Sequence, residues 1–116
     1  MDSGVGVAVD KNSGSVTVTG KFMNTVDFGG GPLVAGTNVV NAFVAKYSSS
    51  GAPLWSKSYF ATLSDEGYAT ASDGNGSSIV AGDFFGTVDL GSGPLTSLLT
   101  GGGVSSADVF LLDVGP

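Results

Sequence analysis

The nonapeptide TVDFGGGPL at residues 25–33 returns as TVDLGSGPL at residues 87–95, and seven of the nine positions are identical at an offset of 62. A repeat of this kind has to be identified before any element is assigned, because it decides the architecture. We therefore interpret the chain as two copies of one unit. The recurring positions are Asp27, Gly29 and Pro32 with Asp89, Gly91 and Pro94, and, upstream, Gly20 and Phe22 with Gly82 and Phe84.

Downstream of the nonapeptide the offset between the copies grows to 67, where NAFV at 41–44 aligns with DVFL at 108–111. The Gly/Ser-rich stretch 101–106 absorbs the difference, and a flexible insertion of this composition belongs in an exposed loop. The sequence thus divides into a first unit, residues 1–66, and a second unit, residues 67–116.

Alternation of apolar and small or polar residues predicts strands throughout both units. Val16 and Val18, for example, should lie on one face of a strand and Thr17 and Thr19 on the other. The segment 54–60 has no counterpart in the second unit, which should therefore be one strand shorter. The expected strands are 5–9, 15–22, 26–28, 42–47 and 54–60 in the first unit, and 68–72, 78–85 and 109–114 in the second.

The composition agrees with an all-β fold and excludes several kinds of chemistry. Apolar residues make up 41% of the chain and charged residues 12%, and there is one Glu and no Arg or Gln, so long exposed helices are not expected. The absence of His and Cys removes the commonest general base, thiolate nucleophiles and the usual ligands of zinc. We expect no catalytic site and no enzymatic activity.

The net charge of −6 is unevenly distributed, because residues 67–116 hold five Asp and no base. An acidic chain without Arg is not expected to neutralise a nucleic-acid backbone. The apolar runs are too short for a membrane span. The Ser/Thr/Gly-rich, charge-poor texture is typical of secreted bacterial proteins, so an extracellular or cell-surface location is expected.

The order of these motifs resembles the bacterial β-propeller repeats of the SBBP type. The resemblance is carried by the VTVTGKF run at 16–22, the nonapeptide, and FVAKYSSSGAPLWSK at 43–57. It implies four-stranded antiparallel blades from secreted or surface proteins, with no shared catalytic residues. The second unit departs from the pattern, because Asp113 stands where the first unit has Lys46 and the last strand is missing.

Two blades cannot close a propeller ring, which has four to eight. An isolated pair would leave apolar faces in water, and a missing strand leaves an open sheet edge that can pair with another chain. We therefore expect either a piece of a longer tandem array or a homo-oligomer that forms a ring or a fibre. The leading functional hypothesis is a non-enzymatic structural or interaction module that self-associates.

Three groups of acidic residues are candidates for a binding or catalytic role, and each also has a structural explanation. The loop DGNGS at 73–77 has oxygen donors at alternate positions, as the start of a Ca²⁺ loop does, but no further carboxylate lies in the next five residues. A hairpin turn explains the same residues and is the favoured interpretation; an ungapped alignment places Lys11 opposite Asp73. Asp27 and Asp89 are expected to accept backbone N–H bonds in their Gly-rich corners. Asp65 and Glu66 are expected in a solvated loop that joins the units.

An aromatic shelf around Trp55 and Tyr59 is the last candidate. These two side chains should share a strand face with Lys57, opposite Leu54, and could stack on a sugar. Packing between blades or subunits explains the same residues. The alternative functional hypothesis is accordingly a lectin-like or Ca²⁺-dependent module that binds a glycan.

Overall fold

The computed structural model describes residues 2–98 and 107–115, and it is all-β, with antiparallel sheets of which none is closed. The Gly/Ser stretch 101–106 lies outside the described residues. The first unit contains β1 (Ser3–Val9), β2 (Val16–Phe22), β3 (Thr25–Asp27), β4 (Pro32–Val34), β5 (Asn41–Tyr47) and β6 (Pro53–Tyr59). The second contains β7 (Ser64–Ser72), β8 (Ser78–Phe85), β9 (Thr87–Asp89), β10 (Pro94–Thr96) and β11 (Asp108–Val114).

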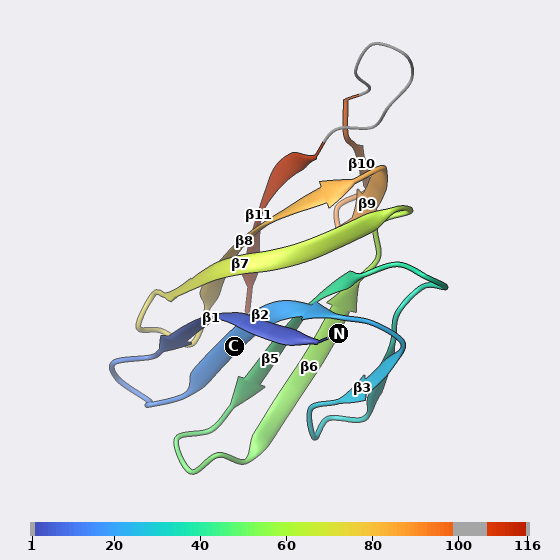
Figure 1. The fold of residues 1–116 in the computed structure, drawn as a ribbon. Coiled ribbons are helices and arrows are strands. Elements are labelled where there is room, and N and C mark those ends of the chain that lie inside the picture. Colours follow the sequence, from blue (N-terminus) through green and yellow to red (C-terminus); the bar gives the residue numbers. More distant parts are fainter. Residues whose placement is uncertain (1, 99–106, 116) are drawn as a thin grey trace.

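The strands form two main sheets and two small hairpins. The first sheet has four strands in the order β1-β2-β5-β6, and the second has three in the order β11-β8-β7, so β11 is an edge of the second sheet. The hairpins β3-β4 and β9-β10 contain the two copies of the nonapeptide. Figure 1 shows the second sheet lying across the first, with β7 nearest to β1 and β2.

The strand pairing defines which residues of the two sheets are equivalent. In both units the first strand carries a β-bulge, between Gly4 and Gly6 in β1 and between Gly67 and Ala69 in β7. Gly4 pairs with Gly20 and Gly67 pairs with Gly82, so the first strands are related by an offset of 63 rather than 62. The ungapped alignment is therefore wrong by one residue in this strand.

The extra residue lies in the turn after the first strand. Backbone N–H groups of Asp10 and Asp73 donate to the carbonyl oxygens of Ser15 and Ser77, at 2.8 and 3.1 Å, so each Asp opens the same turn. The first turn is one residue longer than the second. Asp10, not Lys11, is thus the counterpart of Asp73.

The described residues form two hydrophobic cores, and the first sheet contributes to both. The hairpin β3-β4 covers Phe22, Phe43 and Ala45, and the ring of Phe28 stacks on that of Phe43 with centroids 4.2 Å apart. The second core is formed between the sheets, where Val44 of β5 packs with residues of the second unit; these are Val80, Phe84, Val88, Phe110 and Val114. The two units therefore share a core.

The junction between the units differs from the expected loop. β7 begins at Ser64, so this strand spans the division between residues 66 and 67 that the repeat suggests. Asp65 and Glu66 are strand residues, and Asp65 is only 1% exposed. The expectation of a solvated loop is wrong here, because the connection between β6 and β7 is short and Asp65 finds hydrogen-bond donors inside the protein.

Candidate functional site

The two sheets pack through unlike faces. We define the front face of the first sheet by Thr17, Thr19, Val44 and Lys46, and the back face of the second sheet by Ser78, Val80, Phe84 and Phe110. The hydroxyl groups of Thr17 and Ser78 are 3.1 Å apart, and Val44 lies in one core with Val80, Phe84 and Phe110. The front of the first sheet therefore rests on the back of the second.

Small residues allow the close approach of the sheets. A side chain at Gly67 would overlap the hydroxyl of Thr19, which donates to the carbonyl oxygen of Phe43 at 2.8 Å. A Cβ at Gly6 would come within 3.0 Å of the Cα of Ala69. These glycines set the spacing of β7 on β1 and β2.

Two charged side chains of the first unit reach the turn 73–77 of the second. The ammonium group of Lys46, a residue only 5% exposed, donates to the carbonyl oxygen of Gly76. The carboxylate of Asp10 accepts bonds from Asn12 and Ser13 in its own turn through Oδ1, and from the Ser72 hydroxyl and the Gly76 amide through Oδ2. The pKa of Asp10 lies well below its usual range, mainly because of the bonds from Ser13 and Asn12.

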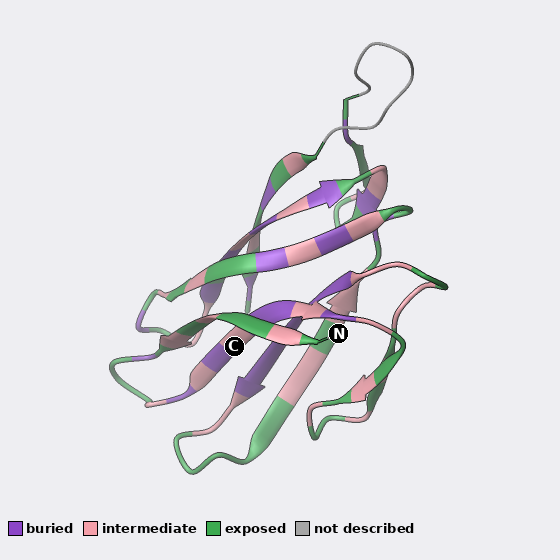
Figure 2. Ribbon diagram, in the orientation of Figure 1, coloured by how far each residue is buried: buried purple, intermediate pink, exposed green. Residues whose placement is uncertain are grey.

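Each main sheet also has a second large face, which the other sheet does not cover. The front face of the second sheet carries Ile79 and Ala81 as the counterparts of Thr17 and Thr19, because β2 and β8 are related by an offset of 62. On β11 it carries Val109, Leu111 and Asp113, with Val109 78% and Leu111 72% exposed. Figure 2 shows β11 with this alternation of exposed and less exposed positions.

This front face is apolar over three strands. Ala69 and Ala71 of β7 pair with Ala81 and Ile79, so their side chains point to the same side of the sheet. With Thr70 these four residues line a shallow depression. Large exposed apolar patches on a protein surface mark interaction sites.

The back face of the first sheet is the second uncovered surface. Val7 and Val9 of β1 pair with Val18 and Val16 of β2, and Val7 is 65% and Val9 60% exposed. The hairpin β3-β4 covers this face only farther along the sheet, around Phe22 and Phe43. The molecule thus presents apolar surface at both ends of the two-sheet stack.

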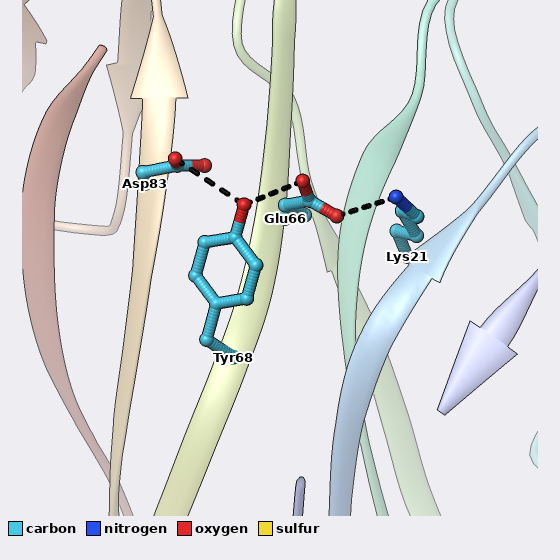
Figure 3. Close-up of polar contacts among 4 residues, drawn as sticks. All are labelled: Lys21, Glu66, Tyr68 and Asp83. Atoms are coloured by element: carbon cyan, nitrogen blue, oxygen red, sulfur yellow. Dashed lines mark hydrogen bonds and ion pairs between the residues drawn. The ribbon is translucent and has the colours of Figure 1, made fainter. Parts of the chain in front are cut away.

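A polar cluster lies at the border between the sheets (Figure 3). Lys21 of β2 forms an ion pair of 2.8 Å with Glu66 of β7, and the Tyr68 hydroxyl donates to Glu66 at 2.6 Å and lies 3.4 Å from Asp83. The hydrogen bond to Glu66 is the main reason why the pKa of Tyr68 lies above its usual range. Partial burial would raise the pKa of Glu66, but the bonds from Lys21 and Tyr68 and the charge of Lys21 together lower it.

Asp65 is the most deeply buried carboxylate among the described residues. Its Oδ1 accepts from the Asn41 side chain at 2.8 Å and from the Ala61 amide at 3.3 Å, whereas its Oδ2 is buried and lacks a hydrogen-bond partner. Burial raises the pKa of Asp65 to about 6, against the effect of these bonds. Asp65 lines a pocket with Lys21, Glu66 and Asp83, but in the described part of the chain no three acidic groups converge as metal ligands would.

The Gly-rich motifs are turns held by carboxylates. The Asp27 side chain accepts from the amides of Gly29 and Gly31 at 2.7 and 3.2 Å, and Asp89 does the same with Gly91 and Gly93 at 2.8 and 3.3 Å. The predicted role of both residues is confirmed. In the candidate Ca²⁺ loop, Asp73 accepts from the amides of Asn75 and Ser77 at 2.7 and 3.1 Å, which is the geometry of an Asx-type turn.

The aromatic residues of β6 are placed as predicted but are not an open shelf. Trp55, Lys57 and Tyr59 pair with front-face residues of β5, and the Lys57 ammonium lies 5.1 Å from the centre of the Trp55 ring. Trp55 and Tyr59 are only partly exposed and pack against the core between the sheets. Leu54, the residue before Trp55, is 53% exposed.

Sequence reasoning missed Asp10 and Asp65 as structural residues. A one-residue gap in the alignment of DKNSGS with DGNGS would have matched Asp10 with Asp73 and revealed the shared turn. No comparable signal marks Asp65. Comparison of the sequence with family models and with curated proteins found no match. Within residues 2–98 and 107–115, no helix has the length and apolarity needed to cross a membrane.

Proposed function

We propose that this protein is a non-enzymatic structural or interaction module that self-associates through its incomplete repeat. The observation that carries the proposal is the uncovered apolar front of the second sheet, with Val109 and Leu111 more than 70% exposed on the edge strand β11. Covering the apolar side chains of such a surface lowers the free energy by about 25 cal/mol per Å² of apolar area buried.

The two units act as the blades of a larger propeller-like assembly in this proposal. Support comes from the stacking of one sheet on the other through a shared core, and from a second sheet that has three strands where the first has four. The absence of His and Cys supports a role without catalysis, and the charge-poor, Ser- and Thr-rich composition supports an extracellular or cell-surface location. The assembly is then a ring of several copies or an open fibre.

The oligomeric state over a wide concentration range tests this function. Sedimentation velocity of the 116-residue chain, from micromolar to near-millimolar, should show a weight-average mass that rises above the monomer mass of 11.4 kDa. A monomeric mass throughout this range, together with a melting temperature independent of concentration, would contradict the proposal.

A further inference from the structure

The uncovered faces of the two sheets are complementary to each other. Inside the molecule the front of the first sheet packs on the back of the second. The uncovered faces are the front of the second sheet and the back of the first. Because the two units are copies of one another, the two uncovered faces correspond to the two faces that pack inside the molecule.

From these relationships we infer that the front face of the second sheet binds the back face of the first sheet of another copy of this chain. The inference deepens the proposed function and rests on it. It selects face-to-face stacking over pairing at the β11 edge. The resulting contact is heterologous, so each copy has one free face at either end, and growth gives a closed ring or, where the rotation does not close, an open fibre.

Polar partners inside the molecule correspond to apolar partners at the proposed contact. Thr17 and Ser78 contact each other through their hydroxyl groups between the sheets. Their counterparts on the uncovered faces are Ile79 and Val16, because both are related to them by the offset of 62 between β2 and β8. Both members of this pair are apolar, so neither would lose a hydrogen bond to water when the two are buried against each other.

The small residues are matched in the same way. Within the molecule the hydroxyl of Thr19 fills the space beside Gly67. Their counterparts are Ala81 and Gly4, so a small side chain again meets a glycine. Close approach of two strands is therefore compatible with both interfaces.

The depression on the front face of the second sheet fits the valines of β1. It is lined by Ala69, Ala71, Ala81, Ile79 and Thr70. In the internal interface β7 lies against β1, and Thr70 and Ser72 of β7 are the counterparts of Val7 and Val9. Val7 and Val9 of a second copy therefore lie over Ala69 and Ala71 of the first, where they cover one another's apolar surface.

Two exposed residues distinguish this contact from other modes of association. Leu111→Lys places a charge on the front face of the second sheet, and Val7→Lys places one on the back face of the first. Leu111 is 72% and Val7 65% exposed, so each variant should fold with an unchanged cooperative melt. Leu95→Lys is the matched control, because Leu95 is 47% exposed on β10 and belongs to neither face.

Each blocked variant alone should associate at least tenfold more weakly than the wild type, and Leu95→Lys should not differ from the wild type. A mixture of the two blocked variants should form a 1:1 heterodimer in sedimentation equilibrium and native mass spectrometry, because one keeps an intact back face and the other an intact front face. The heterodimer should not grow further.

Several outcomes would overturn the inference while leaving the proposed function intact. Front-to-front association would survive Val7→Lys, back-to-back association would survive Leu111→Lys, and pairing at the β11 edge would survive both. The inference is also contradicted if the wild type associates but the mixture of the two blocked variants stays monomeric. A wild type that is monomeric at every concentration removes the proposed function itself. If either variant loses its cooperative melt, Val109→Lys and Val9→Lys, at 78% and 60% exposed positions, repeat the test.

Discussion

The hydroxyl of Ser72 donates a hydrogen bond of 3.2 Å to Oδ2 of Asp10, 62 residues away in the sequence. The same carboxylate oxygen accepts the amide of Gly76 at 2.9 Å, while Oδ1 caps the turn to which Asp10 itself belongs. One side chain thus joins the corresponding turns of both units. Asp10 is 3% exposed, and its four donors explain how a carboxylate remains ionised there.

Asp10→Asn should lower the melting temperature at pH 7 by several degrees. The side-chain NH₂ of the new asparagine would face N–H and O–H groups that are themselves donors. The pKa of Asp10 is lower in the folded than in the unfolded state, so this stabilisation is present above pH 4 and declines as the pH falls below it. The difference between wild type and variant should therefore shrink in thermal melts at pH 3 and below. Asp73→Asn is the control, since Asp73 is exposed and its Oδ1 holds only its own turn; a loss as large as that of Asp10→Asn would contradict the linking role.

The contribution of Asp65 to stability should have the opposite dependence on pH. Its pKa is about 6 in the folded state, against 3.8 for an unperturbed aspartate, so the folded protein binds the extra proton between these values. Stability should consequently fall as the pH rises from below 4 to above 7, by about 3 kcal/mol in total for a shift of this size. Asp65→Asn keeps an acceptor for Asn41 and removes the buried charge.

Chemical denaturation of Asp65→Asn at pH 4, 5, 6 and 8 measures this effect. The variant should gain on the wild type as the pH rises, because only the wild type loses stability through ionisation of this group. Equal slopes of unfolding free energy against pH in the two proteins would show that Asp65 does not titrate in this window.

Most of the fold can be predicted from the repeat and from the alternation of residue types, and some strands are predicted closely. The sequence pattern predicts a strand at residues 78–85, and β8 lies at Ser78–Phe85, because alternating apolar residues and a preceding turn mark it clearly. The separation of Thr17 and Thr19 from Val16 and Val18 is likewise confirmed, since Thr17 and Thr19 face the second sheet and Val18 packs on the other core. A period of two in the sequence is sufficient for such assignments.

Other features depend on contacts that a pattern does not contain. The bulges at Val5 and Tyr68 change which residues share a face, but a bulge adds one residue without any distinctive composition. Asp65 looks like a linker residue because it follows Ser64 and precedes Glu66, and hydrogen bonds from Asn41 of β5 and from the Ala61 amide make its burial tolerable. Trp55 and Tyr59 fit a shelf or a core equally well until the second sheet is placed over them.

Gly20 and Gly82 should be intolerant of any side chain. A Cβ at Gly20 would overlap the carbonyl oxygen of Ser3, and at Gly82 that of Glu66, because the bulge brings the neighbouring strand close. These neighbours are backbone atoms that cannot rotate away. Gly20→Ala and Gly82→Ala should each cost about 2 to 3 kcal/mol of unfolding free energy, as overpacking in a core does.

Gly4→Ala is the control for this prediction. Gly4 pairs directly with Gly20, yet a Cβ there would meet only the Val18 side chain at 3.8 Å, which is ordinary contact. Urea denaturation should show a change of less than about 1 kcal/mol, of either sign. Similar losses at Gly4 and Gly20 would mean that backbone entropy rather than steric overlap explains the repeated glycine.

Asp113 is the residue at which the proposed contact between copies departs most from the internal one. Its counterpart Lys46 donates to the carbonyl oxygen of Gly76, and the counterpart of Gly76 is Gly14, which also has a positive φ of 74°. A lysine at position 113 would therefore reach the Gly14 carbonyl of the next copy, whereas the native carboxylate loses water there without gaining a donor.

Asp113→Lys should accordingly tighten association, by roughly tenfold to a hundredfold, the range of a hydrogen bond that involves a charged group. Asp113→Asn removes the charge without supplying the long donor, so its dissociation constant should lie between those of the wild type and the lysine variant. Sedimentation equilibrium at 0.3 M salt screens the change in net charge and isolates the local effect. Equal affinities for the two variants would mean that only charge repulsion acts at this position, and weaker binding of Asp113→Lys would mean that the front face of the second sheet does not receive the turn 10–15 of another copy.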